Sequence, residues 1–313
     1  MRLFENADYR FISKRKVAFT TSLVLIAIGM IFLVTKGIET GIDFLGGTEF
    51  VVESDVALTV PAVRSALAGP LGGEPEVKSF DDDILIRTTA TGEPDAIQAT
   101  ILSTLDSEFA GANSRVLKRD QISPRFADDL REGAIYAIFF SLLVIFIYIA
   151  LRFEWRFSVG AVAAVFHDVF ITLGLFAMLH HVLPFSLQVD QTILAAFLTL
   201  VGYGINDTVV VFDRIREDMA AFKGDDLETV MDRAINNTLS RTIVTSGTTL
   251  LVVAVLFIFG GEVLRGFAFA LIVGILIGTY SSIYIASPIT YVLRQKFPPK
   301  PAVKAKVTTA SRA

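Results

Sequence analysis

The chain has 313 residues and a formal net charge of −4, so it lacks the strongly basic surface that favours nucleic-acid binding. It contains no Cys, which excludes disulfides, thiolate metal sites and a cysteine nucleophile. Hydrophobic residues make up 53% of the sequence, and long apolar runs recur, which is typical of a membrane protein.

Six apolar runs are each close to the ~20 residues that an α-helix needs to cross a bilayer. We predict membrane helices at 17–35, 132–151, 157–180, 190–212, 242–260 and 265–288. The first run follows the basic stretch SKRK and lacks an A-x-A-like cleavage site. We therefore expect a retained anchor rather than a cleaved signal peptide.

A more polar segment of about 95 residues separates the first two runs and predicts a small α+β domain. Its pattern alternates strands and helices, with Thr59 as a possible N-cap and Ile97, Ile101 and Leu105 on one helix face. The expected elements are strands at 48–53, 76–80, 84–88 and 114–120, and helices at 59–68 and 94–109. The order β-α-β-β-α-β is that of a ferredoxin-like domain.

Lys and Arg are unevenly distributed between the connecting segments, which predicts the orientation of the chain. The basic segments are the N-terminus, the turn at 152–156, a predicted loop at 213–241 and the tail. We expect these on the cytoplasmic side, with both termini. The predicted organisation is a cytoplasmic N-terminus 1–16, a first membrane helix 17–35, an extracytoplasmic ferredoxin-like domain 36–130, a five-helix membrane domain 131–290 and a basic, disordered tail 291–313.

Asp207 lies inside the fourth apolar run, where a charge costs about 2.5–3.5 kcal/mol at the bilayer centre on insertion scales. Residues four apart place Thr199, Tyr203 and Asp207 on one helix face. Arg241 begins the next run at the cytoplasmic end, so the two charges could lie at similar depth and pair. Two interpretations stay open, a proton relay and a static buried pair that fixes helix register.

Other charged or small residues along the membrane helices also allow two interpretations. His167 and Asp168 could form a second proton station or a hydrogen-bonded packing cluster. Asp213 and Arg214 fall at the cytoplasmic boundary, as a solvated helix end or a partner contact. Glu262, at the outer surface, is a candidate for proton entry. The small residues of the sixth run, at 266–286, favour close helix packing.

Sequence signatures of common enzymes are missing from the chain. It has neither G-x-x-x-x-G-K-[ST] nor G-x-S-x-G, and His180 and His181 are adjacent without a spaced set of further ligands. We therefore predict no enzyme activity, no cofactor and no metal. Work, if the chain performs any, would come from an ion gradient, which supplies about 2.3 kcal/mol per charge per 100 mV.

Several long motifs resemble the SecF family, membrane subunits that assist the bacterial Sec protein translocase. The match runs from about residue 10 to 290 and keeps the order and spacing of its motifs. The motifs are GIDFLGGTEF (41–50), RFEWRFSVGAVAAVFHDVFIT (152–172), VGYGINDTVVVFDRIRE (201–217), LSRTIVTSGTTL (239–250) and GGEVLRGFAFALIVGILIGTYSSIYIASPI (260–289).

This resemblance implies an α-helical polytopic protein of the bacterial inner membrane, with six helices that form half of an RND-like bundle and one ferredoxin-like periplasmic domain. It implies a SecD partner, with the SecYEG channel and YajC as further partners, and contacts with the translocating preprotein and membrane lipids but not with nucleic acid. It also implies use of the proton-motive force in late steps of export, after SecA and ATP have driven entry.

The resemblance also assigns roles to individual residues. Asp207 and Arg241 match the family's proton-relay aspartate and its partner arginine, and Asp168 matches a second relay position. We place His167, Asn206, Thr208, Tyr203 and Thr245 as supporting residues. Further family-motif positions are Gly41, Asp43, Gly46, Gly47, Asp213, Arg214 and Glu262.

Three functions remain open from the sequence. The first is the proton-driven export accessory, the second an RND-type small-molecule or lipid exporter half, and the third a passive scaffold for SecD. The insertion of about 95 residues is small for an exporter's substrate domain. A carboxylate–Arg pair without a cluster of neutral oxygens beside Asp207 favours protons over sodium ions.

Overall fold

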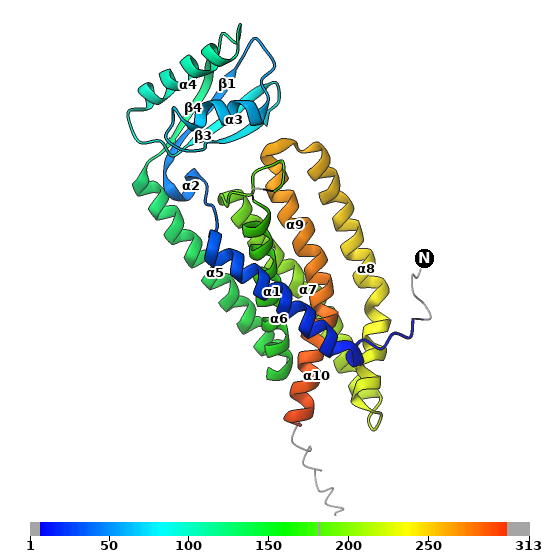
Figure 1. Cartoon of the computed structure of the whole chain (residues 1–313). Coiled ribbons are helices and arrows are strands. Elements are labelled where there is room, and N and C mark those ends of the chain that lie inside the picture. The colour runs from blue at the N-terminus through cyan, green and yellow to red at the C-terminus, as the bar shows by residue number, and fades with distance from the viewer. Residues whose placement is uncertain (1–6, 181, 299–313) are drawn as a thin grey trace, which may run out of the picture.

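The computed structural model describes residues 7–180 and 182–298, and it contains a helical membrane part and a small α+β domain (Figure 1). Six helical segments in this part of the chain are long and apolar enough to cross a membrane. They are α1 (Arg15–Lys36, preceded by the 3-10 turn η1, Ile12–Lys14), α5 (Pro124–Arg152), α6 (Trp155–Leu179), α7 (Gln191–Ala221), α8 (Leu227–Phe259) and a last segment of α9 (Gly261–Ser281), the π-helical η2 (Ser282–Ala286) and α10 (Ser287–Lys296). The prediction of a multi-pass membrane protein with six spans is confirmed.

Two of the helices, α7 and α8, extend further than predicted at the ends away from the α+β domain. Residues 213–241 are not a loop, because α7 continues to Ala221 and α8 already begins at Leu227. Their apolar faces carry Ile215, Met231 and Ile235, which are buried in the same core as the membrane helices. Hydropathy detects the stretch that crosses a bilayer, and these extensions are amphipathic helices outside it.

The predicted tail is also partly helical. Residues 291–296 belong to α10, and the side chain of Tyr291 is buried there. The expectation of disorder is wrong for these residues. The remainder of the predicted tail, 299–313, lies outside the described residues, as does His181.

The α+β domain has the predicted order and forms a four-stranded antiparallel sheet, β2-β3-β1-β4. Its strands are β1 (Gly47–Glu53), β2 (Glu76–Phe80), β3 (Asp83–Thr88) and β4 (Arg115–Ile122), and its helices are α3 (Val60–Ala68) and α4 (Pro94–Glu108). Phe50, Ile86, Leu67 and Ile101 pack together in the core between sheet and helices. The ferredoxin-like prediction is confirmed.

Strand alternation gives the sheet a second, polar face. Glu49 and Glu76 lie directly opposite Arg87 on its two neighbouring strands, whereas Phe50 and Ile86 point into the domain core. This polar face meets the loop before α7, and β2 also contacts α9. The sheet therefore rests on the ends of the membrane part at which α7 and α9 begin (Figure 1).

Small residues set the closest helix contacts in the membrane part. A Cβ atom on Gly29 of α1 would lie 2.9 Å from the Cα atom of Gly174 on α6, so the two backbones touch. In α9, Gly266, Ala270, Gly274 and Gly278 are all buried. The predicted packing role of the small residues in this helix is confirmed.

Candidate functional site

Asp207 lies on α7, with only 3% of the residue exposed, at the junction with α8 and α9. The Ser246 hydroxyl on α8 donates to Oδ2 of Asp207 at 3.1 Å. Thr279 on α9 in turn donates to the Ser246 hydroxyl at 2.7 Å. Asp207 is thus the end of a hydrogen-bonded chain that crosses three helices.

No ion pair within 4.0 Å joins Arg241 to Asp207 among the described residues, so the direct pairing considered above is absent, although the charge of Arg241 still acts on the Asp207 carboxylate. Five residues separate Arg241 from Ser246, which turns the two side chains roughly 140° apart around α8. Arg241 is exposed on this single chain, away from the face that carries Ser246. A static buried pair would need a direct contact between Asp207 and Arg241, and this contact is absent from the described chain.

The supporting residues have different positions around Asp207. Thr208 is buried and its hydroxyl donates to the Gly204 carbonyl at 3.0 Å. Tyr203 donates to the hydroxyl of Thr249 on α8 at 3.3 Å. Thr245 is half-buried on α8, whereas Asn206 is exposed on α7.

A second buried network surrounds Asp168. His167 Nδ1 lies 2.8 Å from Oδ1 of Asp168, and His167 Nε2 lies 2.9 Å from the hydroxyl of Ser22 on α1. The Ser281 hydroxyl on α9 donates to Oδ2 of Asp168 at 2.8 Å. The hydrogen-bonded cluster foreseen as one alternative is present, and it joins α1, α6 and α9.

The two networks approach each other at α9 and at Gly204 of α7. Thr279 belongs to the network of Asp207, and Ser281, two residues on, belongs to that of Asp168. A Cβ atom on Gly204 would lie 3.3 Å from Oδ2 of Asp168, so this glycine lets α7 pass close to the carboxylate. Sequence reasoning missed Thr279 and Ser281, although both are hydroxyl residues inside an apolar run.

The hydroxyls of Ser246 and Thr279 overturn one premise about the coupling ion. The sequence suggested no cluster of neutral oxygens near Asp207, but the Ser246 hydroxyl contacts its carboxylate and the Thr279 hydroxyl contacts Ser246 in turn. Hydroxyl and carbonyl oxygens next to a carboxylate are also compatible with a sodium ion.

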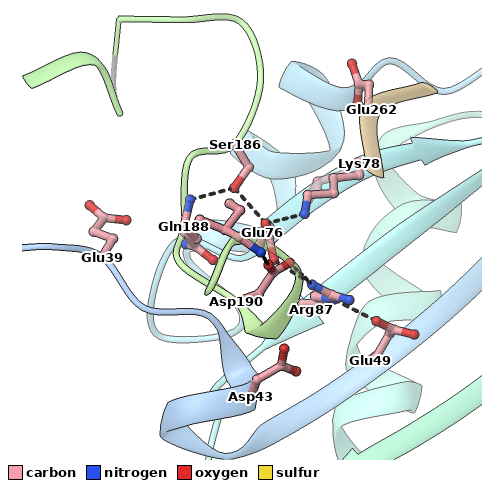
Figure 2. A network of polar contacts seen from close by, with 12 residues as sticks. Glu39, Asp43, Glu49, Glu76, Lys78, Arg87, Ser186, Gln188, Asp190 and Glu262 are labelled. Carbon is pink, nitrogen blue, oxygen red and sulfur yellow. Dashed lines mark hydrogen bonds and ion pairs between the residues drawn. The ribbon is translucent and has the colours of Figure 1, made fainter. Parts of the chain in front are cut away.

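A third polar cluster, here called the docking network, joins the sheet to the membrane part (Figure 2). Arg87 of β3 contacts three carboxylates, Glu49 at 2.6 Å, Asp190 at 3.4 Å and Glu76 at 3.5 Å. Lys78 also contacts Glu76, at 2.8 Å. Of these groups, Asp190 alone comes from outside the domain, so its contact with Arg87 crosses the boundary.

Burial on its own raises the pKa of Glu76, but the positive charges of Lys78 and Arg87 outweigh it and hold that pKa below its ordinary value. The hydroxyl of Ser186, in the loop before α7, also donates to Glu76 at 2.6 Å. Glu76 is therefore an anion that the membrane part and the sheet stabilise together.

The docking network reaches the first turns of α7 and α9. Asp190 is the N-cap of α7, where Oδ1 accepts from the Ile193 amide at 2.8 Å. Glu262, in the first turn of α9, accepts from the amide of Ser79 in β2 at 2.8 Å. Glu262, which we considered for proton entry, thus has a docking contact.

The family-motif residues after α1 belong to the same boundary. Asp43, in the short helix α2 (Ile42–Leu45), accepts from the Gln191 amide at 2.9 Å, and the Gly41 amide donates to the Val189 carbonyl at 2.9 Å. Gly46 and Gly47 have φ values of 80° and 158° in the turn into β1, a conformation that favours glycine.

Asp213 and Arg214 lie within α7 rather than at its end. Asp213 pairs with Arg152 at the end of α5, at 2.9 Å, and Arg214 pairs with Asp218 at 3.1 Å. Both side chains are about 40% exposed, which agrees with a solvated helix surface.

Six spans, carboxylates buried between them and a ferredoxin-like domain at one end of the bundle define a polytopic membrane protein with ionisable groups inside its bundle. A family model described as "Protein export membrane protein SecD/SecF, C-terminal" matches residues 103–296. The chain belongs to this SecD/SecF family of protein export membrane proteins.

Relatives of high similarity carry the description protein translocase subunit SecF. One from Rhodothermus marinus is 59% identical over 95% of this chain and 96% of its own, and one from Desulfurispirillum indicum is 42% identical over 92% of each. The crystal structure of SecDF from Thermus thermophilus, described as a translocon-associated membrane protein, is 35% identical with a TM-score of 0.79. This match covers 94% of our chain but 40% of the SecDF chain.

Proposed function

We propose that the chain is the SecF-type subunit of a Sec preprotein translocase accessory complex in the bacterial inner membrane. In this proposal it works with a SecD-type subunit and uses the proton-motive force to promote late steps of export through SecYEG, with YajC as a further partner. The α+β domain is periplasmic, and both termini are cytoplasmic.

The observation that carries the proposal is the buried carboxylate of Asp207, which accepts a hydrogen bond from the neutral hydroxyl of Ser246. A carboxylate inside a membrane bundle without a bonded cation favours proton uptake, because the neutral form costs less there than the charged form. Each proton that crosses yields about 2.3 kcal/mol per 100 mV.

An exposed polar face next to Asp207 supports the SecD-type partner. Asn206, Arg241 and Thr248 are exposed on α7 and α8 of this single chain, within helices that cross the membrane. Polar groups at membrane depth face a bundle interior or a cavity rather than lipid. A second six-helix half that covers this face would bring its own side chains to Arg241.

The test compares preprotein release from membrane vesicles under an imposed proton gradient for the native chain and Asp207→Asn. Asp213→Asn is the matched control, since it removes a carboxylate from the exposed surface of the same helix. We expect Asp207→Asn to lose gradient-dependent release while the SecD-type partner still co-purifies, and Asp213→Asn to keep it.

Two further arms of the experiment separate the alternatives. Native behaviour of Asp207→Asn in an intact complex would refute the relay and support the passive scaffold. Replacement of sodium by choline tests the ion, and loss of gradient-driven release in choline would show sodium coupling. An exporter half is disfavoured because the domain is small and α3 and α4 pack on its sheet.

A further inference from the structure

An apolar crevice with a volume of about 460 Å³ opens between α5 and the pair α6 and α7. The residues after α1, including Ile38 and Phe44, close its outer end. Its walls are hydrocarbon side chains for most of their surface, among them Ile135, Ile138, Leu142, Phe166, Val169 and Leu198. The crevice is as large as the pockets that hold small ligands, which are about 300–1,000 Å³.

The crevice exists because α5 contacts little of its own bundle. In the most apolar window of α5, 6% of the residues are buried, against 44% in α6 and 39% in α7. Figure 1 shows α5 running down the flank of the bundle directly from the α+β domain. The wall residues on α5 run from Arg131, near the α+β domain, to Leu142, just past the middle of the helix, so the crevice opens on the outer leaflet and reaches the bilayer centre in the proposed orientation.

An apolar opening at this depth is filled in a membrane. Water gains no hydrogen bonds from its walls, and an empty space forfeits the dispersion contacts of every side chain that lines it. The occupant must therefore be hydrocarbon, either a lipid chain or an apolar helix of a partner.

Arg131 favours the lipid. Its side chain lies at the outer mouth of the crevice, is 64% exposed and has a 3.5 Å contact with Asp128. A guanidinium binds phosphate with paired hydrogen bonds. The neighbouring carboxylate of Asp128 suits a headgroup with an ammonium beside its phosphate.

We infer that the crevice between α5, α6 and α7 binds one acyl chain of a membrane phospholipid whose phosphate contacts Arg131. The occupant carries an ammonium, as phosphatidylethanolamine does. A partner helix is the less suitable occupant, because the face that needs a polar partner is the one with Asn206 and Arg241. Lipid binding in this crevice is independent of proton coupling at Asp207.

Native mass spectrometry of the chain purified with its SecD-type partner tests the site, with dioleoyl phosphatidylethanolamine as the probe. Ser141 lines the crevice, so Ser141→Trp should fill it and remove one retained lipid. Phe139→Trp is the matched control, because Phe139 is 59% exposed on the same helix and outside the crevice. Arg131→Gln should weaken retention about tenfold or more, since it removes a charge-assisted hydrogen bond.

Equal lipid retention by Ser141→Trp and Phe139→Trp would overturn the inference, as would unchanged retention by Arg131→Gln. A second measurement uses a milder change in case the filled variant does not fold. Phe166→Trp, in a Trp155→Phe background, changes the volume of the wall little and should be quenched by phosphatidylethanolamine brominated on its acyl chains. Absence of quenching, with a cross-link from Ser141→Cys to the partner instead, would assign the crevice to the partner and refute lipid binding.

Discussion

Replacement of Arg87 by Met tests whether the docking network holds the α+β domain on the membrane helices. Burial on its own lowers the pKa of Arg87, but Glu76, Glu49 and Asp190 raise it above its ordinary value, so the guanidinium is charged. Its side chain is 15% exposed, and those of Glu76 and Asp190 are 4% and 9% exposed. Met keeps most of the volume and leaves these carboxylates without their shared cation.

Breaking a buried ion pair from one side costs about 3–5 kcal/mol. Lys78 still contacts Glu76 after the change, which places the expected cost near the lower end, about 3 kcal/mol. At 1.36 kcal/mol per factor of ten, the undocked state becomes roughly 150-fold more populated.

Amide hydrogen exchange measures that population at the boundary. The amides of Ser79, Gly41 and Val189 are bonded across it, so they should exchange roughly 150-fold faster in Arg87→Met. Asp190→Asn, added to the Arg87→Met variant, should restore part of the protection. It removes one of the unpaired charges, and Asn remains a good N-cap.

Arg115→Met is the control, since Arg115 pairs with Glu53 on the exposed side of the domain, where its side chain is 63% exposed. The Arg115→Met substitution should leave the hydrogen-exchange rates of the boundary amides unchanged. Native exchange rates at Ser79, Gly41 and Val189 in Arg87→Met would refute the reasoning. The domain would then be held by the backbone bonds and by Glu262.

Two further predictions concern acid and helix packing. The pKa of Glu76 is lowered in the folded protein, so Glu76 contributes to docking above its ordinary pKa of 4.5, and this contribution is lost as the pH falls through the folded pKa. Amides at the boundary, corrected for intrinsic exchange, should therefore lose protection below about pH 4.5. Glu76→Gln should flatten this pH dependence. Gly174→Leu should lower the free energy of unfolding of the detergent-solubilised chain by about 1–3 kcal/mol, because the new side chain meets the backbone of Gly29. Gly133→Leu is the control and should have little effect, because its side chain enters open space. Equal thermal unfolding curves for the two variants would contradict the close contact between α1 and α6.

Local patterns were sufficient for most of the fold. An apolar run of bilayer length predicts a membrane helix without knowledge of its neighbours, and alternation with turn residues predicted the β-α-β-β-α-β order. The errors at 213–241 and 291–296 arose because charged, amphipathic helices outside the bilayer do not stand out in hydropathy. Their helical state depends on burial of Ile215 and Met231 in the shared core.

The candidate site was predictable in part. Asp207 and Asp168 stand out as carboxylates in apolar runs, which is a property of the sequence alone. Their partners depend on how neighbouring helices are rotated, so the bond from Ser246 was not found and the pair with Arg241 was wrongly expected. The contact of Arg87 with Asp190 joins residues 103 positions apart, and neither position has a local signal for it.

The docking network and the buried carboxylates are connected by the same two helices. Asp190 and Asp207 are both on α7 or its cap, and Glu262 and Thr279 are both on α9. The members of each pair are seventeen positions apart, which is roughly 26 Å of helix. Both helices begin at the domain and run inward, so a slide of α7 against α9 at Asp207 moves Asp190 relative to Glu262 by a similar amount. These two residues hold β3 and β2, which are paired strands of one sheet. Since paired strands resist shear, such a slide would tilt the whole α+β domain. In the function proposed above, a proton bound at Asp207 would thereby act on the periplasmic side of the membrane.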